Sequence, residues 1–257
     1  MKIFVCNVLL TCLPFVTVTG HAQTAVPAPA QATPAPVDTA KQMAVMQAKL
    51  ADWPQLSRYR GENAALAAPA ADEKRVVFYG DSITDAWGRK PGTEFFPGKP
   101  YVNRGISGQT TPQMVVRFQQ DVVHLKPAVV VILAGTNDIA GNTGPSTPEM
   151  IENNFVSMEE IARANGIKVV ISSILPSSRY GWKPEAQPAE SIRTMNVRLK
   201  ALCAREGLVY LDYYTPMANA KGGLDADLAS DGVHPTAKGY GVMAPLAEKA
   251  IAEALAR

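Results

Sequence analysis

The sequence predicts an α/β fold in which helices cover both faces of a parallel sheet. From residue 75 onward, short runs rich in β-branched residues alternate with segments of helical periodicity, the order of elements that builds a parallel sheet. The run over residues 128–133 is apolar at every position, as expected of a strand that is buried on both faces. A chain of 257 residues with 47% hydrophobic composition can bury one sizeable core around such a sheet.

Five strands are expected, over residues 75–79, 101–103, 127–133, 168–174 and 208–211. The helix before the fourth strand has clear ends, because Thr147 is a suitable N-cap, Pro148 fits the first turn and Gly166 stops the helix. The last helix presents one apolar face, which consists of Met243, Leu246, Ala247, Ala250, Ile251, Ala254 and Leu255.

The first 40 residues have the composition of a targeting segment followed by a linker. Residues 1–22 are predicted to be a signal peptide, because Lys2 precedes an apolar run over residues 3–18 and small residues surround Ala22. That run is too short to favour a membrane-spanning helix, and an uncleaved anchor is the alternative. Residues 23–40 are rich in Ala, Pro and Thr and predict an extended tether. We therefore expect an exported protein, periplasmic or secreted.

Residues 41–257 are predicted to form one domain with an N-terminal helical extension. The extension runs to about Leu66 and is interrupted by Pro54. We expect it to pack on the domain, and a place at the rim of a functional site is the alternative. After the signal peptide Cys203 is the single cysteine, so no internal disulfide forms, and its apolar helical neighbours place it in the core.

The charge balance gives no reason to expect nucleic acid or an anionic membrane surface as a partner. The chain has 25 Lys and Arg against 23 Asp and Glu, a formal net charge of +2, and loss of Lys2 with the signal leaves a value near +1. No second long apolar stretch follows the signal, so stable membrane insertion is not expected.

Four short blocks hold the residue types that serine-based acyl transfer requires. They are Gly-Asp-Ser-Ile-Thr at 80–84, Asn-Arg-Gly at 103–105, Gly-Thr-Asn-Asp at 135–138 and Asp-Gly-Val-His-Pro at 231–235. A serine hydroxyl needs a base to take its proton, and the base needs a carboxylate that fixes its tautomer. The tetrahedral intermediate also needs hydrogen-bond donors that already point at its oxyanion.

The predicted strands bring these blocks to one edge of the sheet. Ser82 follows the first strand, Gly105 the second and Asn137 the third, whereas Asp231 and His234 come after the fifth. In an open parallel sheet, ligands bind beyond the carboxyl ends of the strands, at the point where the strand order reverses. The sequence therefore predicts that these five residues converge on one site.

Two alternatives compete with Ser82 as the nucleophile, namely a helix-capping role for Ser82 itself and a second serine, Ser107. With Asp85 three residues later, it is also a plausible capping box for the helix after the first strand. Ser107 lies at the same edge of the sheet and is a rival nucleophile that position alone does not exclude. Thr84 stands where a G-x-S-x-G nucleophile elbow has its second glycine, which disfavours an α/β-hydrolase.

Two histidines follow the signal peptide, and each lies three residues after an aspartate. His124, after Asp121, ends an amphipathic helix that leads into the third strand, so it belongs to the amino edge of the sheet. His234, after Asp231, lies in a loop beyond the last strand. His234 is therefore the predicted base.

Gly105 and Asn137 are the candidate oxyanion donors. A glycine N–H can approach a substrate closely because no side chain intervenes, and a side-chain amide is a donor that oxyanion holes use. Their ordinary roles would be a turn glycine and a loop cap. A magnesium site is the alternative for the carboxylates, but only one histidine is available to a softer metal and no metal is expected; the carboxylates are Asp81, Asp85, Asp138 and Asp231.

In their order and wording the four blocks resemble the SGNH, or GDSL-type, hydrolase superfamily, and the resemblance runs from about residue 52 to 250. It implies a three-layer α/β/α, flavodoxin-like sandwich with a five-stranded parallel sheet. It also implies Ser82 as nucleophile, His234 as base and Asp231 as its orienting carboxylate, and it decides for Ser82 over Ser107. The implied oxyanion donors are the Ser82 and Gly105 backbone N–H groups and the Asn137 side chain.

The resemblance implies hydrolysis of a carboxylic ester through an acyl-enzyme, with no cofactor. The chain most resembles secreted bacterial members likened to acetyl esterases and platelet-activating-factor acetylhydrolases. Residues 86–100 and 177–188 are expected to line the mouth of the site, with Trp87, Phe95, Phe96, Tyr180 and Trp182 as wall residues. We expect short acyl groups, acetyl on a sugar; the alternatives are a lysophospholipase or thioesterase, or a catalytically silent ligand-binding module.

Overall fold

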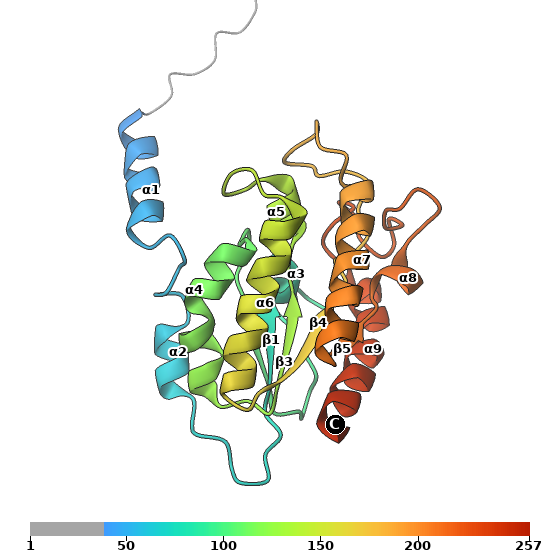
Figure 1. The fold of residues 1–257 in the computed structure, drawn as a ribbon. Helices are drawn as coiled ribbons and strands as arrows, with labels where there is room; N and C mark the ends of the chain where they lie inside the picture. The colour runs from blue at the N-terminus through green and yellow to red at the C-terminus, as the bar shows by residue number, and fades with distance from the viewer. Residues whose placement is uncertain (1–38) are drawn as a thin grey trace, which may run out of the picture. The chain divides into compact units, whose positions relative to one another are not determined.

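The structure is a computed structural model that describes residues 39–257 (Figure 1). The predicted signal peptide, residues 1–22, and nearly all of the predicted tether lie outside the described residues. By its internal contacts the chain divides into two units, Met1–Gln42 and Met43–Arg257, and the second unit contains the whole sheet.

Five parallel strands form the sheet, in the order β2-β1-β3-β4-β5. Their bounds are Val76–Gly80 for β1, Tyr101–Gly105 for β2, Val129–Leu133 for β3, Lys168–Ser172 for β4 and Val209–Leu211 for β5. The predicted α/β fold class is confirmed. β2 is two residues longer than predicted and pairs with β1 as far as Gly105 opposite Gly80. The strand order reverses at β1, which places the switch point between the carboxyl ends of β1 and β3.

In the part of the chain that the structure describes, helices and one 3₁₀ turn lie before, between and after these strands. They are α1 Thr39–Ala51, α2 Arg60–Ala65, α3 Ser82–Ala86, α4 Thr111–Asp121, η1 Val123–Leu125, α5 Thr136–Ala140, α6 Pro148–Ala164, α7 Pro188–Glu206, α8 Tyr214–Met217 and α9 Ala237–Ala256. Of these, α1 and α2 precede β1, the helices α3 to α7 and the 3₁₀ turn η1 fall between strands, and α8 and α9 follow β5. Within residues 39–257, none of these helices is long and apolar enough to cross a membrane.

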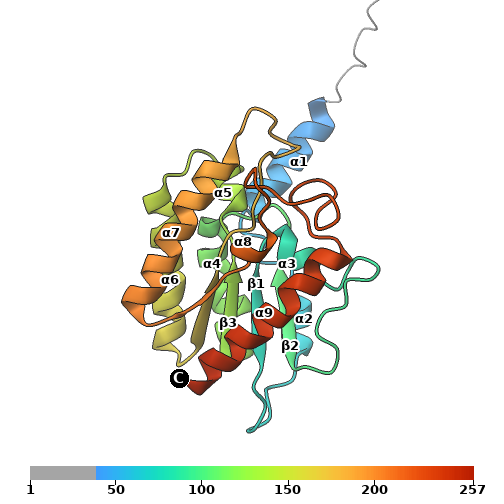
Figure 2. The ribbon, with the colours of Figure 1, turned by 90° about the vertical axis from the view of Figure 1, so that its right-hand side faces the viewer.

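Two cores flank the sheet because alternate strand residues point to opposite faces. Val77 and Ile132 belong to the core beneath α4, α6 and α7, whereas Phe78 and Val131 belong to the core beneath α9. Figure 2 shows α9 crossing one face of the strands, with α6 and α7 on the other side. The domain is therefore the three-layer α/β/α sandwich that the family resemblance implied.

The local helix signals agree with the structure in most details. The Thr147 hydroxyl accepts a hydrogen bond from the Met150 N–H at the start of α6, and Gly166 has a φ of +69° just beyond its end. On α9 the predicted apolar face is buried except at its edges. Leu246 is half-buried, and Leu255, in the last turn, is 40% exposed.

The segment before β1 is helical in part, and α1 ends at Ala51, before the Pro54 that the sequence marks as a break. Side-chain amides of α4 hold the chain that follows α1. Gln113 Nε2 donates to the Trp53 carbonyl and Gln120 Nε2 donates to the Leu56 carbonyl, both at 2.6 Å. Residues 53–56 are therefore tied to the domain next to the end of β2.

Candidate active site

The turn after β1 presents Ser82 as the first residue of α3. The carboxylate of Asp81 caps this helix, since Asp81 Oδ1 accepts a hydrogen bond of 3.0 Å from the Ile83 N–H. Asp85, which the capping-box interpretation would use, pairs instead with Arg89 Nε at 3.1 Å. Gly80 is required here, because a Cβ at this position would lie 2.5 Å from the Leu133 carbonyl oxygen. The hydroxyl of Ser82 is thus left free of a capping role.

A continuous hydrogen-bonded chain joins Ser82 to His234 and Asp231. Ser82 Oγ lies 2.9 Å from His234 Nε2, although 152 positions separate the two residues in the sequence. His234 Nδ1 lies 2.6 Å from Asp231 Oδ2. The second carboxylate oxygen of Asp231 accepts from the backbone N–H groups of His234 at 2.8 Å and Val233 at 2.9 Å. The loop 231–234 therefore holds the carboxylate and the imidazole in a fixed relation.

This arrangement assigns the protons of the neutral imidazole. A neutral histidine donates from one ring nitrogen and accepts at the other, and the carboxylate takes the donor, so Nε2 is left to accept the Ser82 proton. Partial burial of Asp231 raises its pKa, but hydrogen bonds from the His234 N–H, the imidazole and the Val233 N–H outweigh that effect. The pKa of Asp231 consequently lies below its ordinary value.

The rival residues lie elsewhere. His124 is exposed in the turn η1, just before β3, at the amino edge of the sheet. Its neighbour Asp121 is fully buried against Arg117 at 3.1 Å. Ser107 is exposed, and its N–H donates to Asp85 Oδ2 at 3.3 Å. The histidine of the hydrogen-bonded chain thus contacts Ser82 and not Ser107.

Gly105 does not face the site, contrary to expectation. Because β2 extends to Gly105, this glycine lies inside the parallel ladder, and its N–H donates to Asn103 Oδ1 at 2.9 Å. A Cβ at Gly105 would lie 2.1 Å from the Asp85 backbone nitrogen, so the missing side chain allows α3 to pack against β2. Gly105 has a packing role.

Gly108, three residues further on, has the properties expected of Gly105. It is exposed, its φ is +79°, and within residues 39–257 its N–H has no hydrogen-bond partner. The carbonyl of the next residue, Gln109, accepts a hydrogen bond of 2.9 Å from Asn137 Nδ2. The sequence signal for Gly108 was its position in the loop between β2 and the N-cap Thr110 of α4, beyond the end of the strand.

Asn137 is buried at the start of α5, and its amide is held on both sides. Asn142 Nδ2 donates to Asn137 Oδ1 at 2.8 Å, which directs Asn137 Nδ2 toward Gln109 and Asp81. The contact from Asn137 Nδ2 to Asp81 Oδ2 is long, at 3.4 Å. Asn137 therefore has a donor hydrogen beside the residue that precedes Ser82, and that hydrogen is only weakly engaged.

Comparison with known proteins agrees with this geometry. The model of the GDSL-like lipase/acylhydrolase family matches residues 78–242, more than half of the chain. The chain belongs to this family. A solved structure of a GDSL-like lipase from Bacteroides thetaiotaomicron is 43% identical, with a TM-score of 0.75, over 78% of this chain and 98% of that one.

Two curated relatives match over shorter stretches. Esterase TesA of Pseudomonas aeruginosa is 31% identical over 134 residues, which are 52% of this chain and 60% of TesA. An acetylxylan esterase of Geobacillus stearothermophilus is 33% identical over 88 residues, 26% of this chain and 40% of that protein. The chain thus spans less than two thirds of these relatives' own length.

In this GDSL-family protein a buried arginine connects the segments that carry the site residues. Arg117 is fully buried on α4 and donates to the Gly80 carbonyl at 3.0 Å and the Arg104 carbonyl at 2.9 Å. Its Nε donates to Gln109 Oε1 at 2.5 Å. One guanidinium thereby joins the ends of β1 and β2 to the residue whose carbonyl holds Asn137.

The expected aromatic wall is mostly core. Trp87 and Phe96 are buried in a ring cluster under α9, where Trp87 packs against Tyr240 with ring centroids 4.8 Å apart. Phe95 packs edge-on against the same cluster. An apolar ring can line a site or be buried in the core, and the sequence alone does not distinguish these two positions. The exception is Trp182.

Trp182 is 47% exposed and borders the site. Its ring stacks on the buried Tyr180 at 4.8 Å and lies 6.4 Å from the His234 ring. Its Nε1 donates to Asn142 Oδ1 at 3.2 Å, and Asn142 in turn contacts Asn137. Trp182 therefore forms an aromatic wall next to the imidazole.

The four carboxylates of the magnesium alternative have separate partners. Asp81 caps α3, Asp85 pairs with Arg89, Asp138 accepts from the Thr111 N–H and hydroxyl, and Asp231 accepts from His234. Within residues 39–257, no three side chains from His, Cys, Asp and Glu gather as metal ligands do.

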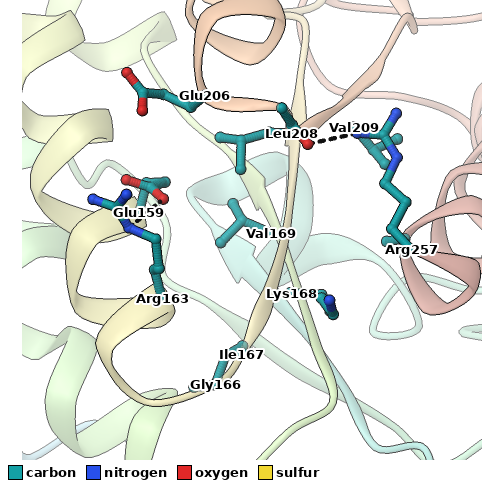
Figure 3. Close-up of a pocket in the computed structure, with 12 residues that line it drawn as sticks. Glu159, Arg163, Gly166, Ile167, Lys168, Val169, Glu206, Leu208, Val209 and Arg257 are labelled. Atoms are coloured by element: carbon teal, nitrogen blue, oxygen red, sulfur yellow. Dashed lines mark hydrogen bonds and ion pairs between the residues drawn. The ribbon is translucent and has the colours of Figure 1, made fainter.

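A separate pocket, with a volume of about 250 Å³, lies at the amino ends of β4 and β5. Figure 3 shows its lining, which includes the ion pair between Glu159 and Arg163 and the side chain of Arg257. It lies at the edge of the sheet opposite to Ser82 and contains no serine, cysteine or histidine. This pocket is therefore separate from the site around Ser82.

Proposed function

We propose that this protein is a serine esterase that hydrolyses short-chain carboxylic esters through an acyl-enzyme. The observation that carries the proposal is the hydrogen-bonded chain from Ser82 Oγ through His234 to Asp231. The family match and the esterase relatives support the same reaction class.

The first half-reaction forms the acyl-enzyme. Ser82 Oγ attacks the ester carbonyl carbon while its proton passes to His234 Nε2, and Asp231 stabilises the resulting imidazolium. The tetrahedral intermediate then collapses, the bond to the alcohol oxygen breaks, and His234 gives its proton to the departing alcohol. The acyl group remains on Ser82 as an ester.

The second half-reaction returns the enzyme to its starting state. His234 takes a proton from a water molecule, whose oxygen attacks the acyl carbon. The bond to Ser82 Oγ then breaks, and the serine recovers its proton from the imidazolium. The products are a carboxylic acid and an alcohol, and the cycle needs no cofactor.

Three donors are proposed to hold the oxyanion, namely the backbone N–H groups of Ser82 and Gly108 and the side chain of Asn137. Gly108 takes the place that Gly105 had in the expectation from sequence, because its N–H has no partner among the described residues and lies in the loop that holds Asn137. Asn137 Nδ2 makes only a long contact, of 3.4 Å, with Asp81 Oδ2. The oxyanion of the tetrahedral intermediate is a stronger acceptor, so Asn137 Nδ2 is able to donate to it instead.

The proposed substrates are acetyl esters of carbohydrates. A hollow of about 330 Å³ borders His234 and is lined mostly by polar and proline side chains, which suits a short acyl group better than a long alkyl chain. The acetylxylan esterase relative supports a sugar as the alcohol. Export, to the periplasm or beyond, is proposed from the composition of residues 1–22.

The decisive experiment labels the purified protein with a fluorophosphonate and assays p-nitrophenyl esters of increasing acyl length. We expect labelling at Ser82 and the highest kcat/KM for the acetyl ester. Ser82→Ala should lower kcat on the order of 10⁶-fold while the protein stays folded. Labelling that survives Ser82→Ala but not Ser107→Ala would place the nucleophile elsewhere. A preference for long acyl chains or thioesters would favour the lysophospholipase or thioesterase alternative, and absence of labelling a silent binding module.

A further inference from the structure

A groove of about 960 Å³ runs from the candidate active site toward the N-terminal extension. Its inner end is formed by Ser107, Asn142 and Gly108, one of the proposed oxyanion donors, and Asn142 contacts a second one, Asn137. Its outer wall consists of residues between 45 and 58, including Trp53 and Arg58. Since the family match begins at residue 78, this outer wall is an addition to the part of the chain that the family model describes.

Hydrogen bonds fix the outer wall where it approaches the site. Asp52 closes a tight turn, because its carboxylate accepts from the Leu56 N–H at 2.7 Å and the Ser57 N–H at 2.9 Å. The Trp53 carbonyl accepts from Gln113, and the Pro54 carbonyl accepts from Gln109 Nε2 at 2.7 Å. The wall therefore rests on the same Gln109 whose carbonyl holds Asn137.

The chemistry of the lining suits a neutral, hydroxyl-rich ligand. The ring of Trp53 is 39% exposed and offers an apolar face, while Asn142, Ser107 and Thr143 offer hydrogen-bonding groups around it. The charged lining residues nearly cancel, because Lys49 and Asp52 have opposite signs and the Arg58 guanidinium is shared by Glu62 at 3.6 Å and Asp85 at 3.8 Å. A flat apolar surface surrounded by polar groups fits a pyranose ring, which has C–H faces and a rim of hydroxyls.

We propose that this groove binds the sugar chain of an acetylated oligosaccharide, with Trp53 as the platform for one sugar ring. The inference rests on the proposed esterase function and names the alcohol side of its substrate. An acetyl ester has a small acyl part and a large alcohol, so the larger of the two hollows at the site suits the alcohol. The groove then selects the substrate, while the residues around Ser82 carry out the reaction.

The experiment compares the KM of two acetyl esters, an acetylated xylo-oligosaccharide and p-nitrophenyl acetate, whose leaving group has no sugar. Trp53→Ala should raise the KM of the sugar ester by about tenfold more than that of p-nitrophenyl acetate, and Trp53→Phe should restore most of the difference. Val116→Ala, which removes a half-exposed side chain of α4 that does not line the groove, is the matched control. It should leave both KM values unchanged.

A second measurement does not depend on turnover. Calorimetric titration of the Ser82→Ala variant with deacetylated xylo-oligosaccharide should detect binding that the additional Trp53→Ala change weakens by about tenfold. Equal KM changes for both esters, or a larger change for a lysophospholipid, would overturn the groove assignment and leave the esterase function standing. A wild-type protein that hydrolyses neither ester would overturn the proposed function, and this inference with it.

Discussion

Ser82 and Asp81 divide two tasks that a single serine could have combined. The carboxylate of Asp81 caps α3, and the hydroxyl of Ser82 is left to contact His234. The motif Gly-Asp-Ser thus has a separate physical reason at each position, since Gly80 allows the close approach of β3, Asp81 satisfies the helix end and Ser82 faces the base.

Asn137 gives the first prediction at this scale. Asn137→Ala should lower kcat by roughly 10²–10³ with little change in KM, because the oxyanion develops mainly in the transition state. Steady-state kinetics on p-nitrophenyl acetate measure both constants. A near-normal kcat in the folded variant would remove Asn137 from the oxyanion hole.

The two histidines give the second prediction. His234→Ala should lose nearly all ester hydrolysis, whereas His124→Ala should keep most of it, since the side chain of His124 is exposed at the amino edge of the sheet. Activity assays on both variants, with circular dichroism as the control for folding, test this difference. Comparable losses would contradict the assigned site.

Much of the site could be read from the sequence because it depends on strand order. The convergence of Ser82, Asn137 and the loop 231–234 follows from which residues come after which strands. The role of Gly105 could not be read, because it depends on where β2 ends and on a hydrogen bond from its N–H to the Asn103 side chain. Burial of Trp87 depends on how α9 covers the sheet, which no local pattern reveals.

At the scale of elements, α4 is the helix that joins the strands to the oxyanion loop. Arg117 contacts carbonyls at the ends of β1 and β2 as well as the side chain of Gln109, and it forms a fully buried pair with Asp121. The helix therefore fixes the position of three segments that meet at the site.

Removing this arginine is predicted to lower the stability of the fold. Arg117→Met should lower the free energy of unfolding by about 3–5 kcal/mol, because Asp121 would keep a buried charge without its partner. Arg205→Met, which breaks exposed surface pairs with Glu206 and Glu152, should cost far less, because water screens such pairs. Urea unfolding measures both, and equal costs would contradict the proposed role of the buried pair.

At the scale of the whole molecule, the buried Asp81 links folding to pH. Burial raises the pKa of Asp81 to about 7. The hydrogen bond from the Ile83 N–H favours the charged carboxylate and acts in the opposite direction, to lower this pKa. An unfolded chain has this carboxyl at its ordinary, lower pKa, so the folded protein binds the proton more tightly. The contribution of Asp81 to stability is therefore fully present below about pH 4 and is lost as the pH rises through 7.

This linkage predicts the behaviour of an amide at the same position. Asp81→Asn cannot ionise, and its side-chain oxygen can still cap α3, so the fall in unfolding free energy between pH 4 and pH 7 should be smaller than in the wild type. Urea unfolding across this pH range measures the difference. Asp72→Asn, at an exposed position, is the control and should follow the wild type. A variant with the wild-type pH dependence would show that Asp81 stays ionised throughout.

The position of His234, immediately before α9, has a consequence for the timing of activity. A chain synthesised only as far as α8 already contains Ser82, Gly108 and Asn137 but has no base. α9 follows the loop 231–234 directly and docks on the sheet close to Ser82, where the Tyr240 hydroxyl donates to the Ile83 carbonyl. The proposed triad is therefore complete only after α9 has been made and has docked, and we expect a nascent chain that ends at α8 to hydrolyse no ester.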